Sequence, residues 1–176
     1  MFRPTTVVLR DGRKAVIRRA RPRDAKPVID HVNAVAAEGI YLLTERLALT
    51  PKEERVVFRK HDAVTAIYLV AVEEDEILGT ATFSRGIPTK SRHVASLGII
   101  LRKDARGIGL GRALMQAGID WARSVGVQKL TLGVFDSNTA ARALYRRLGF
   151  VQEGRLKGHA IIRGKPVDEL RLSLWL

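Results

Sequence analysis

The chain has 176 residues and contains no cysteine. This absence excludes a disulfide framework, a thiol nucleophile and a cysteine-ligated metal site. Long hydrophobic runs are also missing: residues 1–6 contain no apolar signal core, and no run reaches the length of a membrane span. We therefore expect a soluble, cytoplasmic protein with no membrane partner.

Aromatic residues make up only 6% of the chain, whereas the net charge is +13. The first 26 residues contain nine Lys or Arg residues but only two acidic ones, Asp11 and Asp24. Such a basic surface could bind RNA, DNA or an acidic protein. However, neither an aromatic-rich sheet pattern nor a recognisable nucleic-acid module accompanies it. We interpret it mainly as a solvated surface that attracts an anionic ligand, with nucleic-acid binding as the weaker alternative.

Length and composition fit a single domain spanning residues 1–176, because 46% of the residues are hydrophobic and no linker or repeat divides the chain. Asp11-Gly12 is a strong hairpin signal, and Thr50-Pro51-Lys52-Glu53 predicts a capping box with proline at the first helical position. The elements expected in this half are strands 6–10 and 14–20, a helix from Asp24, a helix from Thr50, and strands 67–72 and 77–83.

A glycine-rich loop is the most informative local feature. The residues Arg106-Gly107-Ile108-Gly109-Leu110-Gly111 lie between the apolar run 97–101 and a long amphipathic helix. Glycines let an anion approach the backbone, and the helix start offers unpaired N–H groups. Arg106 adds a positive charge at the rim. We therefore predict a phosphate-binding loop rather than a simple turn.

The spacing of this loop excludes two familiar phosphate-binding motifs. A dinucleotide fingerprint needs a small third residue where this chain has Arg112 or Leu114. A P-loop needs Lys followed by Ser or Thr, and Arg112-Ala113 stands there. The pattern that fits is R-x-x-G-x-G.

With this motif the chain resembles the GCN5-related N-acetyltransferase superfamily. The resemblance extends from about His93 to Phe150 and includes the apolar run 130–135, the segment 138–145 and Leu148-Gly149-Phe150. It implies a mixed, largely antiparallel central sheet flanked by helices on both faces. After Phe150 we expect strands 150–156, 159–162 and 167–174, with a turn at 163–166.

The resemblance also implies that acetyl-CoA is the acetyl donor. Its pyrophosphate would lie on the glycine loop and its pantetheine arm along the strand 97–101. Asn138 would hold that arm, although it also suits a helix N-cap, and the two roles are compatible. The implied cofactor-binding residues are Ile99, Ile100, Leu101, Arg106, Gly107, Ile108, Gly109, Leu110, Gly111, Arg112, Asn138 and Tyr145.

Tyr145 is the predicted catalytic residue. Seven residues after Asn138, it lies on the same helix face and would give a proton to the leaving thiolate as general acid. The alternative is a half-buried core tyrosine that only packs.

The general base stays open. Many members of the superfamily carry a glutamate five residues before the asparagine, where this chain has Gly133. The candidates are a water relay or one of the side chains of Asp136, His93, Glu38 and Glu45.

The acceptor would enter near residues 38–45, which are equally compatible with helix packing. It would be a small amine, an amino-acid analogue or a peptide N-terminus. We predict an N-acetyltransferase that moves the acetyl group directly to a primary amine in a ternary complex, with no metal. The alternatives are a non-catalytic acyl-CoA-binding regulator and a basic nucleic-acid-binding protein. The oligomeric state is open, a homodimer included.

Overall fold

The computed structural model describes residues 2–176. Eight strands form one open sheet in the order β1-β2-β3-β4-β5-β6-β8-β7, and every neighbouring pair is antiparallel except β5 and β6. The predicted mixed, largely antiparallel sheet is confirmed. The strands are β1 (Thr5–Val8), β2 (Lys14–Arg19), β3 (Ala66–Glu73), β4 (Glu76–Arg85), β5 (Val94–Leu101), β6 (Lys129–Phe135), β7 (Val151–Ile162) and β8 (Lys165–Trp175).

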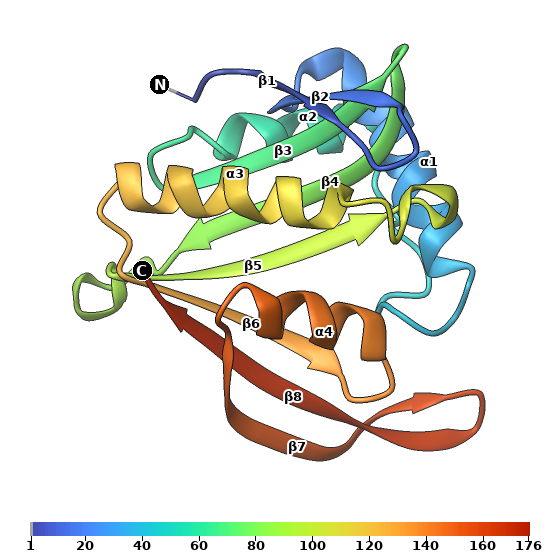
Figure 1. Cartoon of the computed structure of the whole chain (residues 1–176), viewed down its shortest axis with the longest axis vertical. Coiled ribbons are helices and arrows are strands. Elements are labelled where there is room, and N and C mark those ends of the chain that lie inside the picture. The colour runs from blue at the N-terminus through green and yellow to red at the C-terminus, as the bar shows by residue number, and fades with distance from the viewer. Residues whose placement is uncertain (1) are drawn as a thin grey trace.

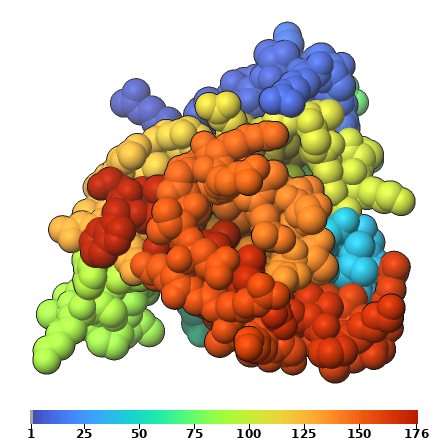
Figure 2. Space-filling model, turned by 60° about the horizontal axis from the view of Figure 1, so that its bottom comes forward, coloured from blue at the N-terminus to red at the C-terminus, as the bar shows by residue number. Residues whose placement is uncertain are grey.

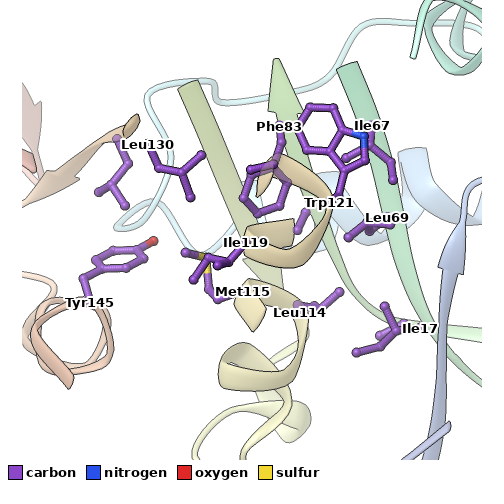
Figure 3. Close-up of a cluster of buried hydrophobic side chains, with 14 of the residues drawn as sticks. Ile17, Ile67, Leu69, Phe83, Leu114, Met115, Ile119, Trp121, Leu130 and Tyr145 are labelled. Atoms are coloured by element: carbon purple, nitrogen blue, oxygen red, sulfur yellow. The ribbon is translucent and has the colours of Figure 1, made fainter. Parts of the chain in front are cut away.

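Four α-helices cover the two faces of the sheet: α1 (Ala25–Ala36), α2 (Pro51–Lys60), α3 (Leu110–Ser124) and α4 (Thr139–Arg147). Helices α3 and α4 lie on one face, and α1 and α2 lie behind the other (Figure 1). The larger core cluster joins the sheet to α3, with Leu114, Met115 and Trp121 among its buried side chains (Figure 3). A smaller cluster packs α1 and α2 on β3 and β4. No helix within residues 2–176 is long and apolar enough to cross a membrane.

Local sequence signals placed most of these elements correctly. The Asp11-Gly12 turn joins β1 to β2, and Gly12 takes the positive φ of 87° that this turn needs. At the start of α2, the Thr50 hydroxyl accepts from the Glu53 N–H while the Glu53 carboxylate accepts from the Thr50 N–H. This reciprocal pair satisfies backbone groups that a helix start leaves open.

One prediction about the last strands was wrong. The two strands expected at 150–156 and 159–162 are one strand, β7 (Val151–Ile162), whose pairing with β8 shifts register between Leu156 and Ala160. Gly158 within this stretch has a φ of +57°. A glycine inside a strand marks a bulge as readily as a turn, and here it bends a continuous strand.

The gap between β5 and β6 positions the site. These parallel strands pair only from Val94 to Ser96 against Lys129 to Thr131, whereas β5 pairs with β4 along seven positions. Beyond Ser96 the two strands diverge. Residues 97–101 therefore have no strand partner on the side of β6. Apart from the Leu101 carbonyl, which accepts from Arg106, their backbone groups on that side are available to a ligand.

Candidate active site

A cavity of about 680 Å³ opens at the gap between β5 and β6. Its walls come from β4, β5, the glycine loop, β6, α4, β8 and the segment between α1 and α2. Figure 2 shows that segment in cyan, next to orange α4 and the red β7–β8 hairpin. The cavity contains the expected residues Ile99, Ile100, Leu101, Arg106, Gly107, Gly109, Gly111, Arg112, Asn138 and Tyr145.

The glycine loop adopts a backbone that other residues resist. Gly107 and Gly109 have φ values of 77° and 97°, in the left-handed region. Gly109 is the N-cap of α3 and has no side chain to accept from the first N–H groups of the helix. These N–H groups and the positive end of the helix dipole suit a bound anion.

Three other loop residues, Ile108, Leu110 and Gly111, contribute to packing. A Cβ at Gly111 would lie 3.1 Å from Leu144 Cδ2, so this glycine allows α3 to approach α4. Leu110 is fully buried in the core, and Ile108 packs against the same cluster. Neither side chain lines the cavity, so only the backbone of these two residues is available to a ligand.

Arginines form a positive rim at this end of the cavity. Arg112 was expected there, but sequence reasoning missed Arg10 and Arg147, which line the same cavity. The Arg10 N–H donates to the Ile108 carbonyl at 3.0 Å, which ties the β1–β2 hairpin to the loop. The only sequence signal for Arg10 was the basic composition of the first 26 residues. Positive groups around helix-start N–H groups strengthen the attraction for phosphate.

The positive charge of Arg106 is paired with a carboxylate of the protein itself. Its guanidinium donates to both carboxylate oxygens of Glu38, one of them at 2.8 Å, and to the Leu101 carbonyl at 2.9 and 3.1 Å. It also lies 4.6 Å from the centre of the Tyr41 ring. Arg106 thus fixes the segment after α1 to the end of β5. The guanidinium still adds positive charge to the rim of the cavity, but it is already ion-paired with the Glu38 carboxylate.

Asn138 begins α4 and also lines the cavity. Its Oδ1 accepts from the Ala141 N–H at 3.1 Å, so the expected N-cap is confirmed. The side-chain amide group is the part of Asn138 that remains to donate to a ligand.

Tyr145 lies at the edge of the larger core cluster, on α4 (Figure 3). The residue is only 5% exposed and packs on Phe150, yet it is part of the cavity wall. Burial raises the pKa of its phenol well above the usual value. The hydroxyl therefore keeps its proton at neutral pH and can donate a hydrogen bond.

The four side chains considered as general bases lie outside the cavity wall. Asp136 pairs with Arg155 at 2.8 Å, His93 stacks on Trp175 at the start of β5, and Glu45 is exposed. The Arg106 guanidinium holds the pKa of the Glu38 carboxyl below its usual range, which makes Glu38 a poor proton acceptor.

Glu169 of β8 was missed by the sequence reasoning. Among the described residues that line the cavity, it carries the sole carboxylate. It is 6% exposed and lies over Gly133 of β6. A Cβ at Gly133 would lie only 1.8 Å from Glu169 Oε1. The sequence signal is an acidic residue in the final apolar strand, but only the register of β6 and β8 brings it to Gly133.

The open α/β sheet, with its splayed parallel strands and a glycine loop at their gap, has the architecture of an acetyltransferase. The chain belongs to the acetyltransferase (GNAT) family, whose sequence profile matches residues 37–150. It is an acetyl-CoA-dependent N-acetyltransferase.

The chain is moderately similar in sequence to several acetyltransferases. The putative phosphinothricin acetyltransferase YwnH of Bacillus subtilis is 25% identical over 154 residues, which cover 86% of this chain and 93% of YwnH. The L-methionine sulfoximine/L-methionine sulfone acetyltransferase of Pseudomonas paraeruginosa is 34% identical over 93 residues, which cover 51% of this chain and 54% of that protein. A GNAT-family acetyltransferase structure from Streptococcus pneumoniae has a TM-score of 0.86 at 29% identity, and the match covers 92% of this chain and 99% of that one.

Proposed function

We propose that this enzyme transfers the acetyl group directly from acetyl-CoA to the primary amine of a small acceptor of the amino-acid type, in a ternary complex. The observation that carries the proposal is that one cavity passes through the sheet at the β5–β6 gap. Asn138 and Tyr145 line it from the α4 side. Tyr41 and Tyr68 line it from the side of α1 and α2. Donor and acceptor can thus meet from opposite faces.

The donor side fits an acetyl-CoA molecule laid along β5. Its pyrophosphate would bind the N–H groups of residues 107–112, with Arg10, Arg112 and Arg147 around it. The pantetheine amides would pair with the free edge of β5 at Ile99 to Leu101, as an added strand does. The Asn138 amide would hold the same arm from α4.

The chemistry needs two further groups near the thioester. A β5 backbone N–H would stabilise the carbonyl oxygen as it gains charge. The Tyr145 hydroxyl would donate to the sulfur as the C–S bond breaks, and its raised pKa keeps that donor in place at neutral pH. Direct transfer needs no covalent enzyme intermediate, in keeping with a chain that has no cysteine.

Two observations support a small acceptor of the amino-acid type. The first is the size of the cavity, about 680 Å³ in all, since most of it would be occupied by the donor arm. The second is that the Bacillus subtilis and Pseudomonas paraeruginosa relatives are both named for acetylation of amino-acid analogues. The acceptor wall includes Leu42 and Tyr41, and the Arg106 guanidinium lies over the Tyr41 ring.

A panel of acceptors tests this proposal. It contains phosphinothricin, L-methionine sulfone, the standard L-amino acids, a simple alkylamine and a peptide with a free N-terminus. Thiol release from acetyl-CoA is followed, and the acetylated product is identified by mass spectrometry. We expect amino-acid-type acceptors to give the highest kcat/KM and initial-rate lines that intersect. Faster turnover of the peptide would overturn the acceptor class, and parallel lines would overturn direct transfer.

A further inference from the structure

The carboxylate of Glu169 occupies the space that a side chain at Gly133 would need. The Cβ of any larger residue at position 133 would overlap Glu169 Oε1, 1.8 Å away. The backbone of Gly133 is that of an ordinary strand residue and imposes no requirement for glycine. With the Glu169 carboxylate in this position, only glycine fits at position 133, and a larger residue there would displace the carboxylate.

The second carboxylate oxygen has no hydrogen-bond partner among residues 2–176. Glu169 Oε2 is buried, and His159 Nε2 lies 3.1 Å from it without the angles of a hydrogen bond. Arg171 forms an ion pair with the other oxygen, Oε1, from which its Nη2 lies 3.3 Å away. A buried carboxylate oxygen without a donor is costly unless something else supplies one. An acceptor ammonium group is such a donor.

Glu169 also points to the acceptor side of the sheet. Its neighbours Leu170 and Leu172 belong to the core cluster that includes α3. Side chains alternate along a strand, so Glu169 faces the opposite side, where α1 and α2 lie. The donor end of the cavity is lined by arginines, whereas Glu169 gives this end its negative charge. An ammonium group is drawn to it.

We infer that Glu169 is the catalytic base, which binds the acceptor ammonium and accepts the proton that its nitrogen must lose before attack. This inference rests on the proposed function. The ammonium gives one proton to Glu169, and the nitrogen lone pair forms a bond to the thioester carbon. As the C–S bond breaks, the nitrogen loses its second proton and the sulfur gains one through the Tyr145 hydroxyl. Glu169 returns its proton to solvent after the amide leaves.

The Glu169→Gln variant separates a base from a structural residue, because Gln keeps the shape and removes the proton acceptor. With the fastest acceptor of the panel, we expect kcat/KM at pH 7 to fall about 10²-fold, the lower range for general-base loss. The variant depends on amine that is already neutral in solution. Its kcat/KM should therefore rise about tenfold per pH unit up to the pKa of the amine, more steeply than that of the wild type.

The charged or titratable side chains that contact the Glu169 carboxylate within the described chain are His159 and Arg171. Glu153→Gln is the matched control: it removes a carboxylate of β7 that pairs with Lys129 outside the main cavity, and it should keep the wild-type pH profile. Acetyl-CoA affinity, measured by calorimetry, should be unchanged in both variants and reports that each is folded.

A relocated carboxylate completes the test. In the double variant Gly133→Asp/Glu169→Ala, the Cβ of the new side chain lies 1.8 Å from the position of Glu169 Oε1, and the side chain restores a carboxylate from β6. We expect at least tenfold recovery over Glu169→Gln. Gly133→Ala, which displaces the carboxylate without removing it, should reproduce the pH-dependent loss even if Glu169→Gln does not fold.

The outcomes are distinguishable. If the wild type releases no thiol with any amine, the proposed function itself fails. If the wild type turns over and Glu169→Gln loses nothing, or loses the same factor at every pH, the inference about Glu169 alone is overturned. A double variant that folds but recovers no activity would also contradict it.

Discussion

The conformation of Gly109 allows a specific test of the glycine loop. At φ 97° and ψ −11°, an L-residue other than glycine is strained by about 1–2 kcal/mol. The space around the position is not the obstacle, because the nearest atom to an added Cβ would be Arg10 Cγ at an ordinary 3.9 Å. Gly109→Ala should therefore lower stability by about 1–2 kcal/mol, or about 2–8 °C in Tm for a chain of this size.

A matched control separates strain from ligand binding. Gly126 follows α3, has a φ of 76° and has no atom within 4 Å of an added Cβ. Because it lies outside the cavity wall, Gly126→Ala should cost similar stability and leave acetyl-CoA affinity unchanged. In Gly109→Ala the loop must shift its N–H groups to relieve the strain, and we expect at least about tenfold weaker binding.

Thermal unfolding with and without acetyl-CoA provides the assay. At a ligand concentration of 100 Kd the wild type should gain about 2.7 kcal/mol, and tenfold weaker binding would reduce this to about 1.4 kcal/mol. Calorimetry gives the affinity directly. If Gly109→Ala is destabilised like Gly126→Ala but binds acetyl-CoA as tightly as the wild type, the loop is only a connector.

Three further predictions follow from the same site. Tyr145→Phe should lower kcat about 10²-fold in single-turnover measurements and keep acetyl-CoA affinity, because only the hydroxyl is lost; an unchanged chemical step would leave Tyr145 as a packing residue. Arg112→Ala should narrow the difference in affinity between CoA and unphosphorylated pantetheine, measured by calorimetry, and equal losses for both ligands would contradict a phosphate contact. Glu38→Gln should be less stable than the wild type by about 1 kcal/mol or less in urea unfolding at neutral pH. Arg106 lowers the pKa of Glu38 in the folded protein. The stability difference between wild type and Glu38→Gln should therefore be complete above the usual pKa of a glutamate and disappear as the pH falls through the lowered pKa of Glu38. A stability difference that does not change with pH would contradict this role of the ion pair.

Local signals were enough to predict most elements of the fold. The capping box at Thr50, the Asp11-Gly12 turn and the periodicity of α3 each depend on residues close in sequence. The glycine loop belongs to the same category, since its conformation follows from glycine itself and from the helix that it precedes. The continuity of β7 was missed because a glycine can bend a strand as well as end it.

Long-range pairing could not be predicted from the sequence. Arg106 forms an ion pair with Glu38, which lies 68 residues away in the sequence, so its charge is paired within the protein. Glu169 reaches the space above Gly133 only because β8 pairs antiparallel with β6 in one register. A shift of one residue would turn Glu169 to the other face of the sheet. The sequence showed that position 133 is a glycine, but it did not show that the Glu169 carboxylate lies beside it.

A crystal structure of the wild-type enzyme with acetyl-CoA would test the central claim most directly. We predict pyrophosphate on the N–H groups of residues 107–112, pantetheine against the free edge of β5, and the thioester sulfur within hydrogen-bond distance of the Tyr145 hydroxyl. The acetyl carbon should face the Glu169 carboxylate through the β5–β6 gap. A thioester bound away from Tyr145, or an acetyl group separated from Glu169 by the sheet, would contradict the account.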